Sequence, residues 1–554
     1  MRFNNETFEN AQDIVQAFSD YFSSVYSTST NSDVTDFYDY NNVPIIHIES
    51  VTVDEVSTAI KNLKNGNISG PDLIPAFFIK DCAAVFAEPL TRIFNLALAT
   101  NVFPDSWKNA NVTPVFKSGD SNDVSNYRPI SILSNFAKIF ENVLYVRIYS
   151  KVRRLISIHQ HGFMAHRSTT TNLACLSHVI AETIDKRGQV DVIYTDFKKA
   201  FDSIPHDIII AKLFNFGFNE GLLKLFKSYL SNRSQRVLYN NFKSDSVIVT
   251  SGVPQGSTLG PLLFLLYIND LTALLKCGAL LFADDLKLFT QVSSISDCQF
   301  LQEQLNSVVR WCSTNCLFLN ISKCKIVTYA KKHQPIVYNY VVHSLRLTRV
   351  DLVKDLGVYF DSKFTFSHHI ATVTRSAMST LGFILRNCKS FNNMVALKAL
   401  FFLLVRSKLE YCSLIWFTSS KKNIDLIEHV QRRFLKFLYY KTEGHYPPRG
   451  FCHETKLNLF HVSSLEDRRI KSSITFLFNI VHDKLDTPDL LSKINFLVPS
   501  YHYRLSLPFH LSPPRTNVLY MSPILSSCKT YNNLCKTVDI FNSTLTCIFT
   551  EINL

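Results

Sequence analysis

The sequence predicts a mixed α+β fold, and three patterns lead to this prediction. Apolar and other residues alternate over 190–196, which is typical of a β-strand. Two apolar runs, 279–283 and 286–289, flank the pair Asp284–Asp285, which is typical of a β-hairpin with the two aspartates at its tip. Between 301 and 312, apolar residues recur at helical spacing. Together these patterns favour an antiparallel sheet that is backed by helices.

The composition indicates a large folded protein with a basic bulk. The chain has 554 residues, of which 46% are hydrophobic and 13% aromatic, so it can bury a sizeable core in several domains and is not disordered. The net charge is +13, but residues 1–100 carry only 5 Lys and Arg against 13 Asp and Glu. The excess of positive charge on the remainder favours a polyanionic partner such as nucleic acid, although many soluble proteins are equally basic.

The 13 cysteines show no repeating spacing, and the N-terminal segment is polar. We therefore expect reduced thiols inside a cell rather than disulfides in a secreted protein. Cys312, Cys316 and Cys324 could suggest a metal, but zinc sites prefer tighter pairs, so buried thiols are the favoured interpretation. The longest apolar run, 259–268, is too short to span a bilayer, and we expect no membrane segment.

Three aspartates are candidate metal ligands. Asp284 and Asp285 would repel each other between two apolar strands, and a divalent cation such as Mg²⁺ would supply the counter-charge. In isolation, the same pair could be an ordinary turn. Asp196 stands at the end of the predicted strand 190–196, where a ligand can reach it. Two-metal phosphoryl transfer needs more carboxylate than one pair, so we group Asp196 with Asp284 and Asp285.

A glycine-rich turn lies between these carboxylates in the sequence. Residues 251–260 contain three glycines and one proline, and an apolar run follows them. A turn of this kind, leading into a helix, lets the backbone approach a substrate closely.

Seven segments stand in a specific order: NYRPISILS (126–134), QHGFMAHRSTTTNL (160–173), VDVIYTDFKKAFD (190–202), SGVPQGSTLGPLLFLLYINDL (251–271), LLFADDLKLF (280–289), LNISKC (319–324) and KDLGVYFDSK (354–363). In this order they resemble the reverse transcriptases of non-LTR (LINE-type) retrotransposons, most closely the jockey-like group. The resemblance implies a right-hand polymerase architecture with fingers, a palm containing an antiparallel sheet, a thumb, and a mostly helical C-terminal extension.

The resemblance also assigns roles to individual residues. Asp196 and Asp284 would hold Mg²⁺, or alternatively Mn²⁺, with Asp285 as a weaker ligand. Lys323 would be the general acid for pyrophosphate, with Lys325 as its competitor. Phe201 would be the gate that rejects a ribose 2′-OH. Nucleotide binding is assigned to Arg128, Arg167, Phe197, Phe201, Gln255 and Gly256. Asp202 is expected to be a structural acid rather than a metal ligand.

Nucleic-acid contacts are expected at two later segments. Lys354 and Gly357 belong to the turn that would grip the primer end. The segment 421–441 resembles a thumb helix along the template–primer duplex, with Arg432, Arg433 and Lys436 facing outward. A solvated basic helix is the alternative interpretation.

The sequence departs from the family pattern at two positions where the family has glycine. These positions are Leu73, after Gly70-Pro71-Asp72, and His166, before Arg167. Because glycine adopts conformations that other residues avoid, we expect a stiffer turn at Leu73, and the backbone conformation at His166 stays open.

The expected organisation has five parts: an acidic leader and linker (1–50, with a polar linker at 27–42), an N-terminal extension to the fingers (51–97), the reverse transcriptase domain (98–360), a helical thumb (361–441) and a C-terminal extension (442–554). Full-length family members carry an endonuclease before the leader, so the chain is expected to be a truncated copy or a fragment.

The function predicted from the resemblance is RNA-directed DNA polymerisation by a two-metal mechanism, copying element RNA into cDNA. The expected partners are an RNA template, a DNA primer or target, dNTPs and an endonuclease acting in trans. The expected localisation is intracellular, in a cytoplasmic ribonucleoprotein and the nucleus. Two alternatives are kept: a degenerate RNA-binding remnant, and an RNA-dependent RNA polymerase. Ala283 and Phe201 favour DNA synthesis over the latter.

Overall fold

The computed structural model describes residues 1–4, 6–26, 44–332, 334–416, 420–497, 507–534 and 539–551. The linker expected at 27–42 lies outside these residues. The fold is a mixture of helices and sheets, as the sequence predicts. The described cysteines form no disulfide, and burial raises the pKa of the Cys312 thiol to about 12.

The central sheet is a five-stranded, mainly antiparallel sheet with the order β14-β11-β5-β10-β9. Its hairpin is the one predicted at 279–289, and β5 is the strand predicted before Asp196. Only the pair β11–β14 is parallel. The strands are β5 (Gln189–Tyr194), β9 (Gly278–Phe282), β10 (Asp285–Gln291), β11 (Lys325–Ala330) and β14 (Thr348–Arg349).

The two faces of the central sheet belong to two hydrophobic cores. Val190, Val192 and Tyr194 of β5 pack in the core that contains α6 (Thr169–Asp185), whereas Ile193 packs in the core that contains α10 (Leu259–Ile268) and α11 (Ile295–Thr314). Side chains of a strand alternate between its faces, so both faces need an apolar partner. Helices therefore cover both faces of the sheet, so polar side chains that a ligand can reach are expected at the strand ends.

The tip of the hairpin differs by one residue from the prediction. Asp285 is the first residue of β10 and pairs with Phe282, so the two turn residues are Ala283 and Asp284. Ala283 has a φ of 56°, which is a left-handed conformation that two-residue hairpin turns require. The apolar pattern could not reveal this conformation, because alanine rarely adopts it.

A second sheet, the N-terminal sheet, has the order β4-β3-β6-β7, with β8 also pairing with β6. Helix α1 (Ala11–Ser23) packs on it, and Val15, Phe18 and Phe22 share a small core with the strands. Apolar and aromatic residues recur at roughly helical spacing in this segment, which is typical of an amphipathic helix: Phe8, Ile14, Val15, Phe18, Tyr21 and Phe22. The strands are β3 (Asn109–Phe116), β4 (Tyr127–Ile132), β6 (Arg233–Tyr239), β7 (Phe242–Lys243) and β8 (Val247–Val249).

Helices connect and surround the two sheets. Helix α2 begins with a capping box between Thr52 and Glu55, which satisfies amide groups of the first turn. The remaining helices of this part are α2 (Val53–Lys61), α3 (Ala76–Asp81), α4 (Ala83–Thr100), α5 (Asn135–Val152), α7 (Ala200–Ser203), α8 (His206–Asn215) and α9 (Glu220–Leu230). Short strand pairs are β1 (Arg2–Phe3) with β2 (Glu6–Thr7), β12 (Val341–Val342) with β13 (Leu345–Arg346), and β15 (Leu352–Asp355) with β16 (Val358–Asp361).

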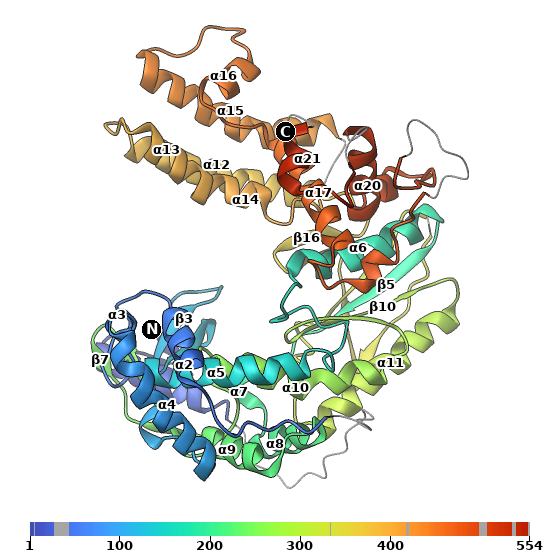
Figure 1. Cartoon of the computed structure of the whole chain (residues 1–554). Coiled ribbons are helices and arrows are strands. Elements are labelled where there is room, and N and C mark those ends of the chain that lie inside the picture. The colour runs from blue at the N-terminus through green and yellow to red at the C-terminus, as the bar shows by residue number, and fades with distance from the viewer. Residues whose placement is uncertain are drawn as a thin grey trace.

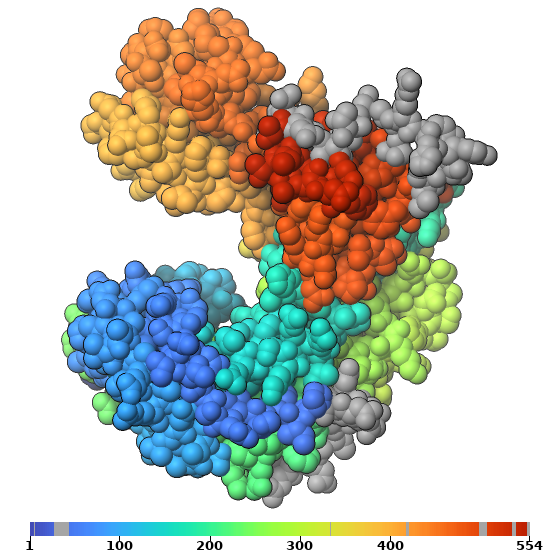
Figure 2. All heavy atoms as spheres, viewed as in Figure 1, coloured from blue at the N-terminus to red at the C-terminus, as the bar shows by residue number. Residues whose placement is uncertain are grey.

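Beyond β16 the chain forms a projection, which we call the helical arm (residues 367–459). Figure 1 shows it on the opposite side of an open space from β3 and α3, and the space-filling view shows a hollow between the two parts (Figure 2). Its helices are α12 (Ser367–Asn387), α13 (Met394–Phe401), α14 (Ser407–Glu410), α15 (Lys421–Glu443) and α16 (His453–Leu459).

The last part of the chain packs back on the central sheet. Helices α18 (Pro488–Leu491), α19 (Asn517–Tyr520) and α20 (Pro523–Leu534) contact α6, and α17 (Leu465–Val481) packs on α20 and α21 (Leu545–Glu551). No helix in the described ranges is long and apolar enough to cross a membrane.

Both positions at which the family has glycine keep a left-handed backbone. Leu73 has a φ of 61° and His166 a φ of 64°. A non-glycine residue in this region costs about 1–2 kcal/mol. The Leu73 side chain is 75% exposed, so packing offsets little of this cost. At His166 the ring Nδ1 lies 3.2 Å from the Lys484 carbonyl oxygen, which is a contact that glycine could not make.

We predict that Leu73→Gly raises the free energy of unfolding by about 1 kcal/mol, because the backbone strain is relieved and little buried surface is lost. Denaturant unfolding measures this change. Leu96→Gly is the matched control: Leu96 is 63% exposed but lies inside α4, so it should lose about 1 kcal/mol. A loss of stability in both variants would contradict the strain at Leu73.

Candidate active site

The hairpin turn that carries Asp284 is clamped by the segment 160–162. The buried amide of Gln160 accepts a hydrogen bond from the Ala283 N–H (2.9 Å) and donates one to the Ala283 carbonyl (3.2 Å). The Gly162 N–H donates to the same Gln160 oxygen (2.8 Å). A Cβ on Gly162 would lie 2.2 Å from the Ala283 nitrogen, so only glycine fits. The turn is therefore fixed before any substrate arrives.

Asp196 lies directly after β5, at the same end of the central sheet as this turn. The neighbouring Thr195 N–H donates to the Leu286 carbonyl of β10 (3.0 Å), and the Asp196 carbonyl accepts from the Asn320 N–H (2.7 Å). The carboxylate lies 3.7 Å from the Lys323 ammonium. The strands β5 and β10 and the turn before β11 thus bring three residues of the predicted site together.

The carboxylates of this cluster influence one another. Burial, together with the charge of Asp196, raises the pKa of Asp284 above its ordinary value, while Lys117 and Arg128 oppose the rise. Loss of solvation, together with the negative charge of Asp284, raises the pKa of Asp285 to about 7. The site therefore holds negative charge at a cost, and a bound cation would reduce that cost.

Cations from three elements surround the two aspartates. Burial lowers the pKa of Lys117, and the charges of Arg128 and Lys323 lower it further, whereas Asp196 and Asp284 raise it. Lys117 follows β3, Arg128 lies on β4, and Lys323 precedes β11. The N-terminal sheet thus presents positive charge to the strand ends of the central sheet. Lys117 could not be predicted as a site residue, because one lysine after a strand carries no sequence signal of its own.

Among the described residues, no group of three or more His, Cys, Asp or Glu side chains could hold a metal ion by itself. The expected ligand set of Asp196, Asp284 and Asp285 is therefore not a preformed metal centre. The Asp285 carboxyl also senses the charges of Asp355 and Lys287. Asp196 and Asp284 remain as a pair, which fits Mg²⁺, because that ion combines one or two carboxylates with substrate phosphates.

The glycine-rich turn packs on the protein's own backbone. A Cβ on Gly252 would lie 2.6 Å from the Asp202 backbone, and one on Gly256 would lie 2.3 Å from the Ser131 carbonyl oxygen. Both glycines have positive φ values, 80° and 131°. At these two positions glycine is needed for close packing against α7 and β4.

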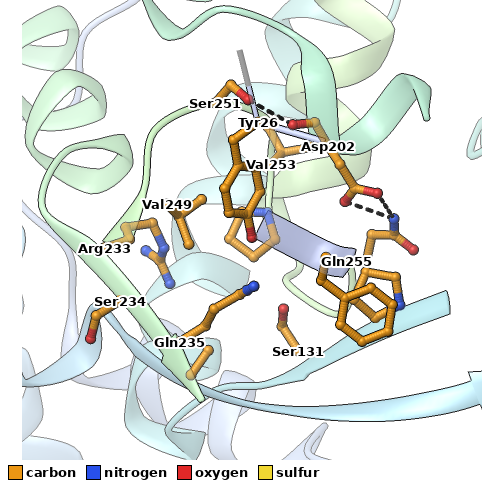
Figure 3. A pocket seen from close by; sticks show the side chains of 14 residues that line it. Tyr26, Ser131, Asp202, Arg233, Ser234, Gln235, Val249, Ser251, Val253 and Gln255 are labelled. Carbon is orange, nitrogen blue, oxygen red and sulfur yellow. Dashed lines mark hydrogen bonds between the residues drawn. The ribbon is translucent and has the colours of Figure 1, made fainter. Parts of the chain in front are cut away.

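Gln255 of this turn is held by Asp202. Its amide nitrogen donates to both Asp202 oxygens, at 2.8 and 2.9 Å (Figure 3). Burial raises the pKa of Asp202 to about 6. The structural role expected for Asp202 therefore has a specific partner. Tyr26, from the end of the N-terminal segment, fills the adjoining pocket and leaves a cavity of only about 20 Å³.

Phe201 is partly buried between other aromatic rings. Its ring stacks on Phe264 at 4.3 Å between centroids, and Phe163 meets it edge-on at 6.1 Å. These contacts fix the position of the Phe201 ring on the short helix α7, which follows Asp196 in the chain. A fixed ring is a requirement for a steric gate.

Two residues that were expected to bind nucleotide are buried in other roles. The side chain of Arg167 is 3% exposed, pairs with Asp486 (2.7 Å), and donates to the carbonyls of Ser157, Ile158 and Gln160. It fastens the C-terminal helices to the central part instead of facing a triphosphate. The ring of Phe197 is 4% exposed and lies in the core, so this side chain cannot contact a nucleotide.

The β15–β16 turn, with Lys354 and Gly357, is attached to the β9–β10 hairpin by buried polar contacts. The buried Lys287 of β10 pairs with the buried Asp355 of β15 at 2.6 Å and donates to Asn172 of α6 at 2.6 Å. Lys354 points outward over the Tyr359 ring, and Gly357 has a φ of 89° against Tyr411. The turn is thus held at a fixed position relative to Asp285.

On α15, the three expected basic residues differ in their surroundings. Arg433 and Lys436 are exposed, whereas Arg432 is partly buried and pairs with Asp425 at 3.3 Å. The apolar spacing of this helix predicts that Ile424, Ile427, Phe434 and Leu438 face inward. The last three are buried, and Ile424 is partly buried.

An aspartate of the hairpin turn and an aspartate at a strand end thus interact electrostatically with cations from a second sheet. Residues 116–385 match the reverse transcriptase (RNA-dependent DNA polymerase) family, and the chain contains a reverse transcriptase domain of this family.

The curated relatives are mobile-element polymerases. Over 75% of its length, the chain is 28% identical to the probable RNA-directed DNA polymerase from transposon BS of Drosophila melanogaster, of which it covers 47%. It is also 28% identical to the RNA-directed DNA polymerase from mobile element jockey of the same species (59% of the chain, 37% of the relative), and similar to that of the X-element. The domain is thus related to those of non-LTR retrotransposons. The chain spans about half the length of the relatives it matches, or less.

We predict that Gly162→Ala reduces DNA synthesis on an RNA template by about a hundredfold, because the added methyl group displaces the turn that carries Asp284, and a shift of about 1 Å at a reacting group costs this much. Steady-state primer extension measures the change. Gly382→Ala on α12 is the matched control, since its Cβ would meet only the flexible end of Arg386. Full activity in a folded Gly162→Ala variant would contradict the clamp.

Proposed function

We propose that the chain is an RNA-directed DNA polymerase that copies retrotransposon RNA into cDNA. In this proposal the central sheet is the palm and the N-terminal sheet belongs to the fingers, both within the expected domain 98–360. The helical arm (367–459) contains most of the thumb that is expected at 361–441. The observation that carries it is the juxtaposition of Asp196 and Asp284 with Lys117, Arg128 and Lys323 at one end of the central sheet.

In the proposed mechanism, Asp196 and Asp284 hold divalent ions, with Asp285 in an outer role. When bound, Mg²⁺ or Mn²⁺ would favour ionisation of the primer 3′-OH and neutralise charge on the phosphates. Burial, and to a smaller extent the charge of Asp196, raises the pKa of Asp284, and a bound cation would offset both effects.

The remaining residues of the site would position the nucleotide. Lys117 and Arg128 neutralise the triphosphate oxygens from the side of the N-terminal sheet. Lys323 is exposed, lies beside Asp196, and donates a proton to the leaving pyrophosphate. Gln255, held by Asp202, supports the new base pair, and the Phe201 ring excludes a ribose 2′-OH.

The expected partners are an RNA template, a DNA primer and dNTPs. Lys354 and Gly357 would lie at the primer end, and an endonuclease in trans would supply the nick. Cytoplasmic ribonucleoprotein and nuclear localisation remain part of the same proposal.

We predict that Asp284→Ala lowers Mg²⁺-dependent primer extension with dNTPs by about a thousandfold or more, since a ligand for charge neutralisation in the transition state is lost. The assay contains the purified chain, an RNA template and a DNA primer. Asp207→Asn, at an exposed aspartate of α8, is the control and should keep full activity. Extension with NTPs alone would instead identify an RNA polymerase. RNA binding without extension, unchanged by Asp284→Ala, would identify a binding remnant.

We predict that Phe201→Val increases the use of NTPs relative to dNTPs by roughly ten- to a hundredfold, because the smaller side chain leaves room for a 2′-OH. Competition between the two nucleotide types in primer extension measures the ratio. Phe214→Val, at a 66% exposed position of α8, is the control for the same substitution away from the site. An unchanged ratio in Phe201→Val would refute the gate.

A further inference from the structure

The helical arm contains a groove whose lining includes Arg433 and Lys436, two of the basic residues expected on the thumb helix. It lies between the C-terminal parts of α12 and α15, and its volume is about 570 Å³. The groove is lined by Leu385, Arg386, Lys389, Arg433, Lys436, Phe437, Tyr440, Lys441 and Tyr446. A cavity of this size can take a nucleotide-sized ligand.

The lining of the groove is strongly positive. Five of its nine residues are Lys or Arg, and none is acidic. Lys441 is engaged locally, donating to Asn392 at 3.2 Å. In contrast, Arg386, Lys389, Arg433 and Lys436 make no ion pair among the residues that the structure describes. Each of these four is exposed, so the groove offers unpaired positive charge to a polyanion.

Aromatic rings stand beside these cations. Tyr440 and Tyr446 stack on each other with 4.8 Å between centroids and 20° between planes, and they are 40% and 63% exposed. The short loop after α15 therefore brings a second ring to the first. Exposed rings among cations are the combination with which proteins hold unpaired bases and the backbone that carries them.

The groove is remote from the catalytic hairpin. Helix α12 begins next to β16, close to the central sheet, and the groove lies at its other end. A helix of 21 residues is roughly 30 Å long, so a ligand in the groove would not be at the primer terminus.

We propose that this groove is a separate binding site for single-stranded nucleic acid. Arg386, Lys389, Arg433 and Lys436 contact the phosphates, and bases stack on the pair formed by Tyr440 and Tyr446. A duplex already stacks its bases internally and cannot use the two rings. The site adds to the proposed polymerase function a place that holds an unpaired strand away from the catalytic centre, and binding alone tests it, whether or not the chain synthesises DNA.

The test measures fluorescence anisotropy of the full chain with labelled dodecamers of uridine RNA, thymidine DNA and a twelve-base-pair duplex. In the double variant Tyr440→Ala/Tyr446→Ala, affinity for a single strand should fall by roughly tenfold or more, because stacking is worth about 1–3 kcal/mol per base. Duplex affinity should change less than twofold. Loss for RNA alone, or for RNA and DNA together, supports the site and identifies which strand it accepts.

A charge variant provides an independent readout. Arg433→Gln/Lys436→Gln should reduce the slope of log affinity against log salt for the single strand by about 1.4, at about 0.7 for each lost phosphate contact. Lys61→Gln/Lys64→Gln, at exposed positions on and after α2, is the matched control and should leave the slope unchanged. Unchanged single-strand affinity in both groove variants, or an equal loss for the duplex, would overturn the proposal.

Discussion

The geometry of the site depends on one close approach, that of the Gly162 backbone to the turn between β9 and β10. Two carboxylates of like charge, Asp196 and Asp284, are held at one end of the central sheet, and folding gains nothing from their repulsion. The turn would relax away if it were free. Gln160 prevents this with hydrogen bonds to both backbone groups of Ala283, and Gly162 lets the two segments touch. The cost at the carboxylates is therefore offset by packing and hydrogen bonds behind them.

Buried polar contacts further from the turn also hold the site in place. Lys287, two residues beyond Asp285, joins the hairpin to β15 and α6 by a buried ion pair and a hydrogen bond. A buried pair of this kind contributes little net stability, but it strongly disfavours any arrangement that separates its members. Asp202 fixes Gln255 in a comparable way. Residues of the candidate site are thus positioned by residues outside it, so the geometry of the site is fixed without a bound ligand.

Local patterns were sufficient for part of this arrangement. The strand before Asp196, the hairpin and the amphipathic α15 follow from apolar periodicity, and the family order of motifs links the aspartates. Local patterns could not predict the role of Arg167. Its ion-pair partner Asp486 is 319 residues away in the sequence, so no local pattern indicates this ion pair. The prediction of the hairpin tip was wrong by one residue for a different reason. Alanine rarely adopts a left-handed φ, so the sequence does not indicate the conformation of Ala283. Lys117 acquires its position only from the packing of two sheets.

The attachment of the C-terminal helices has a consequence for how the gene can vary. Arg167 binds Asp486, and Asp185 accepts hydrogen bonds from the backbone of Arg515 and Thr516, so residues far beyond the matched family region cover α6. Helix α6 in turn forms one side of the central sheet. A chain that ends before Asp486 would therefore lose part of the apolar cover of α6, and with it support for the sheet that precedes Asp196.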